Sequence, residues 1–107
     1  MFDKILAAID HSKIADRALV AACDLALLPK GEVRVLRERE IATKTGVVLT
    51  DETADDASAA VAAAVDKLIA AGVKTHGHVG TTIFGYAARS IVDNAIEHDV
   101  GVIVMGR

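Results

Sequence analysis

The residues of this sequence best suited to bind a small molecule stand where short apolar runs end. Asp10 follows the apolar run of residues 4–9, and Gly106 follows the run of residues 101–105. A carboxylate there can accept hydrogen bonds from a ribose or a base, and a glycine lets backbone N–H groups approach an anion. Asp10 can equally begin a helix and Gly106 can simply end a strand, so position alone leaves both readings open.

Sequence patterns for phosphate binding and for catalysis are incomplete elsewhere in the chain. Gly80 and Gly85 are five residues apart, but Tyr86-Ala87 stand where the phosphate loop of NTPases needs a Lys-Ser/Thr pair, and no Gly-x-Gly-x-x-Gly occurs. Cys23 falls on the apolar side of a predicted helix, which is typical of an inert packed thiol. We find no catalytic residues and expect a binding protein, not an enzyme.

Two histidines have a spacing that could serve a metal ion. His76 and His78 point to the same face of a predicted strand, but no Cys or acidic residue nearby in the sequence completes a ligand set. We therefore predict that this pair lies on an exposed strand face and that the chain holds no metal.

Composition limits the class of protein. The 107 residues form one domain, residues 1–107, and 52% of them are apolar although only two Phe and one Tyr are aromatic. An aliphatic core of this kind suits a parallel sheet covered by Ala-rich helices. The net charge is −3 and the basic residues are scattered, which argues against a nucleic-acid partner. Without a signal-like start, a long apolar run or a second cysteine, we expect a cytoplasmic protein with no membrane partner.

Strands and helices alternate along the predicted chain. Apolar runs predict strands at residues 4–9, 32–36 and 101–105, and alternation predicts a half-exposed edge strand at 73–79. We expect the charged run after Leu36 to end the second strand, residues 37–49 to form a loop, and residues 80–82 to form a turn. This order gives an α/β domain with a parallel sheet and helices on both faces.

Three helices are predicted between these strands. The first is capped by Ser12 and ends at Pro29, and the second is capped by Thr50 and ends at Gly72. Helical spacing gives the second helix a buried stripe of Ala57, Val61, Ala64, Leu68 and Ala71. The third helix is expected to bury Phe84, Ala88, Ile91, Val92 and Ala95 and to expose Arg89, Asp93, Asn94 and Glu97.

Two segments resemble the universal stress protein family. The opening Lys4-Ile-Leu-Ala-Ala-Ile-Asp-His-Ser12 is similar to the family's first strand and turn, and Ala88-Arg-Ser-Ile-Val-Asp-Asn-Ala95 with Val102-Ile-Val-Met-Gly-Arg107 is similar to its third helix and fourth strand. The resemblance implies a Rossmann-like, doubly wound sheet of order 3-2-1-4-5. The fifth strand is absent from this sequence, which leaves 3-2-1-4.

The resemblance also implies a ligand. Some family members bind ATP, most form homodimers, and the family is linked to survival under stress. Asp10 matches the aspartate that meets the nucleoside, and Met105 and Gly106 match the Met-Gly that opens the phosphate loop, with Arg107 beside them. The implied cofactor is ATP, at Asp10, Met105, Gly106 and Arg107, and the implied partner is a second copy of the chain.

The sequence departs from the family after Gly106. The remainder of the phosphate loop, the fifth strand and the last helix are not in these 107 residues. We expect either that the functional polypeptide continues past Arg107 with them, or that the apolar fourth strand pairs with another chain. Two functions therefore stay open: an ATP-binding stress protein, or a nucleotide-free dimeric interaction module. A phosphorylated receiver domain is set aside, because no Asp stands near Gly80.

Overall fold

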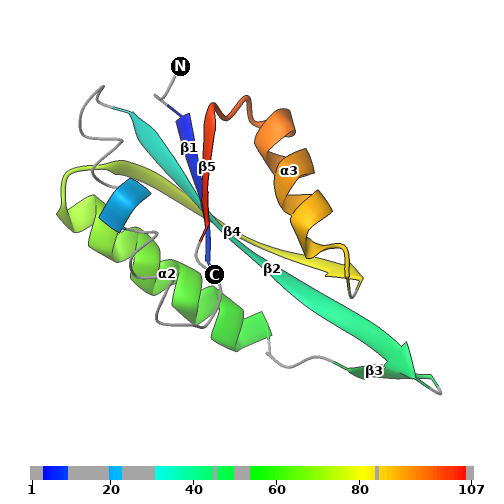
Figure 1. Cartoon of the computed structure of the whole chain (residues 1–107). Helices are drawn as coiled ribbons and strands as arrows, with labels where there is room; N and C mark the ends of the chain where they lie inside the picture. The colour runs from blue at the N-terminus through cyan, green and yellow to red at the C-terminus, as the bar shows by residue number, and fades with distance from the viewer. Residues whose placement is uncertain are drawn as a thin grey trace.

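The computed structural model describes residues 4–9, 20–22, 31–44, 46–49, 54–83 and 85–105 (Figure 1). Its centre is a parallel sheet of four strands: β1 (Lys4–Ala8), β2 (Glu32–Lys44), β4 (Lys74–Ile83) and β5 (Val102–Met105). β1 lies between β2 and β5, and β4 pairs with the outer side of β2. In chain order these strands are arranged 3-2-1-4, which confirms the predicted α/β, doubly wound fold.

Two helices cover opposite faces of this sheet. Figure 1 shows α2 (Ala54–Ala70) on one face and α3 (Ala87–Glu97) on the other. Alternate residues of each strand therefore contribute to two apolar clusters. Ile5, Val33 and Val35 pack on the α2 side, and Leu6 and Leu36 pack on the α3 side. All five side chains are fully buried, so they form the rigid centre on which the strand ends are fixed.

The second helix follows its predicted pattern closely. Ala57, Val61, Ala64 and Leu68 are buried as expected, whereas Ala71 lies beyond the end of the helix and is exposed. Gly72 has a φ of 87°, the left-handed conformation that commonly ends a helix and that glycine adopts at little cost. Of the first predicted helix, the structure describes residues 20–22 as helical, and Ala22 is buried in the α2-side cluster. Ser12, Cys23, Thr50 and Phe84 lie outside the described residues.

The predicted loop at residues 37–49 is wrong. β2 continues through the charged run to Lys44 and turns at Gly46 into the antiparallel β3 (Val47–Leu49). β1 ends at Ala8, opposite Leu36, so the rest of β2 extends beyond the central sheet. Its pairing with β4 continues to Ile41. Arg37, Arg39 and Glu40 of this ribbon are half-buried, and Glu38 is buried between β2 and β4, so the charged run does not end the strand.

The predicted turn at residues 80–82 is also wrong, for the same reason. These residues belong to β4, which reaches Ile83 and stays in register with β2 from Glu32↔Lys74 to Ile41↔Ile83. The chain turns later, where the Tyr86 N–H donates to the carbonyl oxygen of Ile83 at 3.0 Å. β4 is an edge strand of the described sheet, as the alternating pattern predicted.

The third helix is rotated relative to its prediction. Ile91 and Ala95 are buried as expected, but Ala88 and Val92 are exposed and Asn94 is half-buried. The Arg34 side chain donates a hydrogen bond from Nε to Asn94 Oδ1 at 2.9 Å, and Ser90 Oγ donates to Thr82 Oγ1 at 3.0 Å. These bonds hold the polar flank of α3 over β2 and β4. Among the described residues, no helix is both long enough and apolar enough to cross a bilayer.

Candidate functional site

The carboxyl ends of β1 and β5 meet at the point where strand order reverses. Ala8 pairs with Met105, and the Ile9 N–H donates to the carbonyl oxygen of Leu36 at 2.9 Å. The next strand in the chain, β2, lies on one side of β1, and β5 lies on the other side. In doubly wound sheets this reversal of strand order opens a crevice where ligands bind. The structure thus places the strands that carry the predicted site side by side at one edge.

Most of the predicted site lies beyond these strand ends. Asp10, Gly106 and Arg107 are outside the described residues, so their position facing one another stays a prediction. Met105 is described: it ends β5 beside Ala8 and its side chain is 53% exposed. Its exposure at the switch point is consistent with a residue available to a ligand.

Glu38 is a buried acidic residue that sequence reasoning missed. It follows Leu36 by two residues on the same face of β2, just beyond the end of β1, and is only 8% exposed. Its carboxyl group lies over Gly80 of β4, where a Cβ would meet both carboxyl oxygens. Burial raises the pKa of Glu38, while the charges of His78 and Arg37 act in the opposite direction. When protonated, this group can donate a hydrogen bond at the ligand edge of the sheet.

No local signal distinguishes Glu38 in the sequence. It is one of four alternating charges, Arg37-Glu38-Arg39-Glu40, which indicate a solvated segment. Only the pairing of Glu38 with Gly80 creates the space for its carboxyl group. Glu40, two residues later, accepts the Gly85 N–H at 2.6 Å on Oε2 and so fixes the turn that leads into α3.

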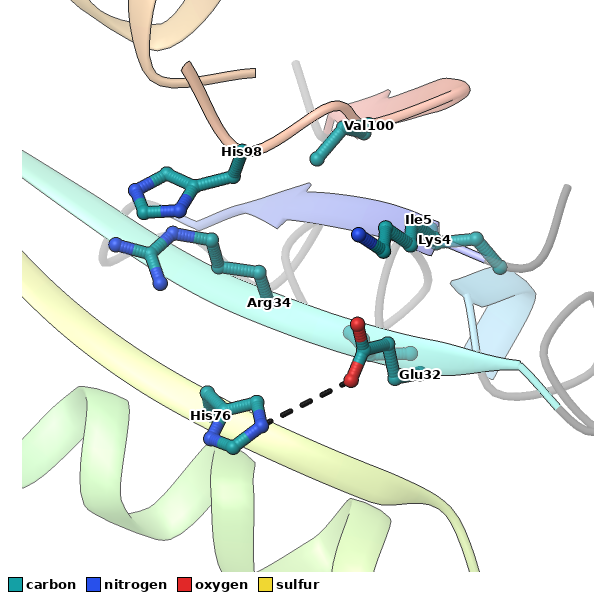
Figure 2. Close-up of a pocket in the computed structure, with 8 residues that line it drawn as sticks. Lys4, Ile5, Glu32, Arg34, His76, His98 and Val100 are labelled. Carbon is teal, nitrogen blue, oxygen red and sulfur yellow. Dashed lines mark ion pairs between the residues drawn. The ribbon is translucent and has the colours of Figure 1, made fainter. Parts of the chain in front are cut away.

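A separate cavity lies at the opposite, amino edge of the sheet. Its volume is about 150 Å³, and Figure 2 shows its lining side chains, which come from β1, β2, β4 and the segment after α3. His76 is in this lining and pairs with Glu32, Nε2 to carboxyl oxygen, at 3.8 Å. His76 and His78 are both exposed on β4, as predicted. Among the described residues, no three His, Cys, Asp or Glu side chains are grouped to hold a metal ion.

An apolar surface flanks the described end of β5. Ile103 and Met105 lie on the α3 side of the sheet, and the turn of α3 presents Val92 and Ile96 on the flank opposite Asn94. These four side chains are between 37% and 73% exposed. α3 packs over β2 and β4 instead, so this face of β5 has no covering element among the described residues.

Comparisons with known proteins agree on one family. The sequence profile of the universal stress protein family matches residues 1–107. A universal stress family protein from Burkholderia pseudomallei superposes with a TM-score of 0.83 at 20% identity, covering 99% of this chain and 82% of that one. A universal stress protein from Archaeoglobus fulgidus gives 0.76 at 27% identity, over 98% and 76%.

A nucleotide complex is among these similar structures. The universal stress protein from Archaeoglobus fulgidus in complex with dAMP gives a TM-score of 0.74 at 27% identity, covering 98% of this chain and 80% of that one. No curated protein sequence gives a significant match.

Proposed function

Because this chain belongs to the universal stress protein family, we propose that it is a stress-response protein that binds an adenine nucleotide at the carboxyl ends of β1 and β5. The observation that supports the proposal is the pairing of Ala8 with Met105 at the strand-order reversal, because these two residues directly precede the segments predicted to bind the nucleotide. The dAMP complex of a relative that is 27% identical supports an adenine nucleotide as the ligand class.

Each predicted residue has a defined role in this proposal. The Asp10 carboxylate accepts hydrogen bonds from the nucleoside. Met105 borders the ligand at the end of β5, and Gly106 lets the backbone approach the phosphates. The Arg107 guanidinium supplies positive charge to them. ATP is the specific nucleotide proposed. We propose binding without catalysis, because the sequence offers no nucleophile paired with a base.

The decisive experiment measures nucleotide affinity by titration calorimetry. We expect Asp10→Ala to weaken ATP and dAMP binding about tenfold or more, because a hydrogen bond to a charged group contributes about 1.5–3 kcal/mol. Asp93→Ala is the matched control, since Asp93 is an exposed carboxylate on α3 and should leave affinity unchanged. Equal affinity of wild type and Asp10→Ala would remove Asp10 from the site.

Mass spectrometry of small molecules released by denaturing the purified protein identifies the natural ligand. Recovery of an adenine nucleotide supports the proposal. If no nucleotide is recovered and none binds in calorimetry, the binding function is rejected.

The alternative function is a nucleotide-free module that works as a homodimer. It is favoured by the exposed apolar surface of Val92, Ile96, Ile103 and Met105, because such patches commonly mark interfaces. A second copy would pair with the edge of β5 and cover these side chains. Sedimentation analysis tests this alternative. Ile96→Lys should shift the protein toward monomer, whereas Ile69→Lys, at another exposed site on α2, should not. A monomeric wild type would reject this alternative.

A further inference from the structure

Four of the eight described residues that line the cavity at the amino edge of the sheet are Lys, Arg or His. Lys4 begins β1, Arg34 lies in β2, His76 in β4, and His98 caps the carboxyl end of α3. Figure 2 shows the His98 ring over the Arg34 guanidinium in that view, with Glu32 turned toward His76. These four residues come from distant parts of the sequence, and only the parallel register of the strands brings them to one edge.

Glu32, the one acidic residue among the described residues of the lining, is already paired. A carboxyl oxygen of Glu32 lies 3.6 Å from Lys74 Nζ and 3.8 Å from His76 Nε2. Lys74 balances the Glu32 charge from outside the cavity, which leaves Lys4 and Arg34 as an excess of positive charge. His76 and His98 place two imidazole rings in the same lining, whose ring N–H groups are further hydrogen-bond donors.

Arg34 is held in a position suited to anion recognition. Its Nε donates to Asn94 Oδ1 at 2.9 Å, which fixes the plane of the guanidinium from the side of α3. Its two terminal nitrogens have no hydrogen-bond or ion-pair partner among the described residues, and neither does the Lys4 ammonium group. A planar guanidinium with free terminal donors matches the two oxygens of a phosphate or carboxylate.

The size of the cavity selects a small ligand. Its volume of about 150 Å³ corresponds to roughly five water molecules at about 30 Å³ each. That space holds a small oxyanion with its hydration. Pockets for whole drug-sized ligands are commonly about 300–1,000 Å³, so this one is too small to enclose a nucleotide.

We propose that this amino-edge cavity binds a small oxyanion of the phosphate, sulfate or carboxylate class, with Arg34 and Lys4 as the principal donors and His76 and His98 completing the site. The anion would lie at the opposite end of the strands from the proposed nucleotide site. The site is therefore separate from the nucleotide's own phosphate contacts, and its test does not depend on nucleotide binding.

Inorganic phosphate is the probe, followed by amide chemical shifts in NMR titrations. We expect saturable shifts around Ile5, Val33 and Val100, which line the cavity. Shifts confined to residues near Ala8 and Met105 would place phosphate at the carboxyl edge and overturn the proposal, as would non-saturable shifts.

Charge-removing variants complete the test. Arg34→Gln should weaken phosphate binding about tenfold or more by removing a charge-assisted pair of hydrogen bonds. Arg89→Gln removes the same charge from an exposed position on α3 outside the cavity and should bind as the wild type does. If Arg34→Gln is unfolded, Lys4→Gln serves in its place, since Lys4 stands at the start of β1. Unchanged affinity in a folded variant of either residue would overturn the assignment.

Discussion

Gly77 of β4 lies directly beneath Val61 and Val65 of α2, and replacing it with alanine tests the packing of the helix on this strand. A Cβ at this position would lie 2.6 Å from Val61 Cγ1 and 2.9 Å from Val65 Cγ2. Because carbon atoms prefer separations of about 3.5–4.0 Å, α2 would have to move outward by roughly 1 Å. Four buried residues hold α2 against the sheet, so the helix cannot yield at this point alone.

Two opposing effects determine how much Gly77→Ala changes the free energy of unfolding. Overpacking destabilises the folded protein by about 1–3 kcal/mol. Alanine has less conformational freedom than glycine in the unfolded chain, which stabilises the folded protein by about 0.4–1 kcal/mol. The backbone of Gly77 is not in the left-handed region, so alanine adds no strain there. We expect a net loss of about 1–2 kcal/mol in the free energy of unfolding. At about 4–8 °C per kcal/mol for a domain of this size, the melting temperature should fall by about 5–15 °C.

Urea denaturation followed by circular dichroism measures this loss, and a double variant identifies its cause. Val61→Ala removes the nearer methyl group, so Gly77→Ala should be much less harmful in the Val61→Ala background. We expect a favourable coupling energy of about 1 kcal/mol or more between the two changes. A Gly77→Ala variant as stable as the wild type, or strictly additive effects, would refute the argument from close packing.

Three further predictions follow from single contacts. The raised pKa of Glu38 means that its protonated form is favoured by folding. The stability that this protonated carboxyl contributes is fully present below its ordinary pKa of 4.5, and it is lost as the pH rises through the pKa that Glu38 has in the folded protein. Glutamine carries no ionisable proton, so Glu38→Gln should become more stable relative to the wild type as the pH is raised from 4 to 7. Melting curves that show no such trend would contradict this prediction. Asn94→Ala removes the acceptor of Arg34 and should cost about 0.5–1.5 kcal/mol in urea denaturation, and an unaltered midpoint would show that the bond contributes nothing. A chelator should leave the melting temperature unchanged, and a fall of several degrees would reveal a metal at His76 and His78.

The sequence by itself determined the fold and the buried stripes. Short aliphatic runs without polar interruption are typical of strands in a sheet that is covered on both faces, and the spacing of the buried residues from Ala57 to Leu68 is that of one face of a helix. These are local patterns, and the structure confirms them at β1, β5 and α2. Asp10 and Gly106 could be selected as site residues because the ligand edge of such a sheet follows from strand order alone.

Tertiary structure decided the features that depend on contacts between residues far apart in the sequence. β2 continues past Leu36, and β4 includes residues 80–82, because these two strands pair with each other. In the sequence, the charged run after Leu36 and the glycine at position 80 instead indicate a loop and a turn. The rotation of α3 follows from the bond of Asn94 to Arg34, sixty residues away. Lys4, Arg34, His76 and His98 likewise have no common pattern in the sequence. They share a cavity because parallel strands begin at the same edge, where residues distant along the chain become neighbours.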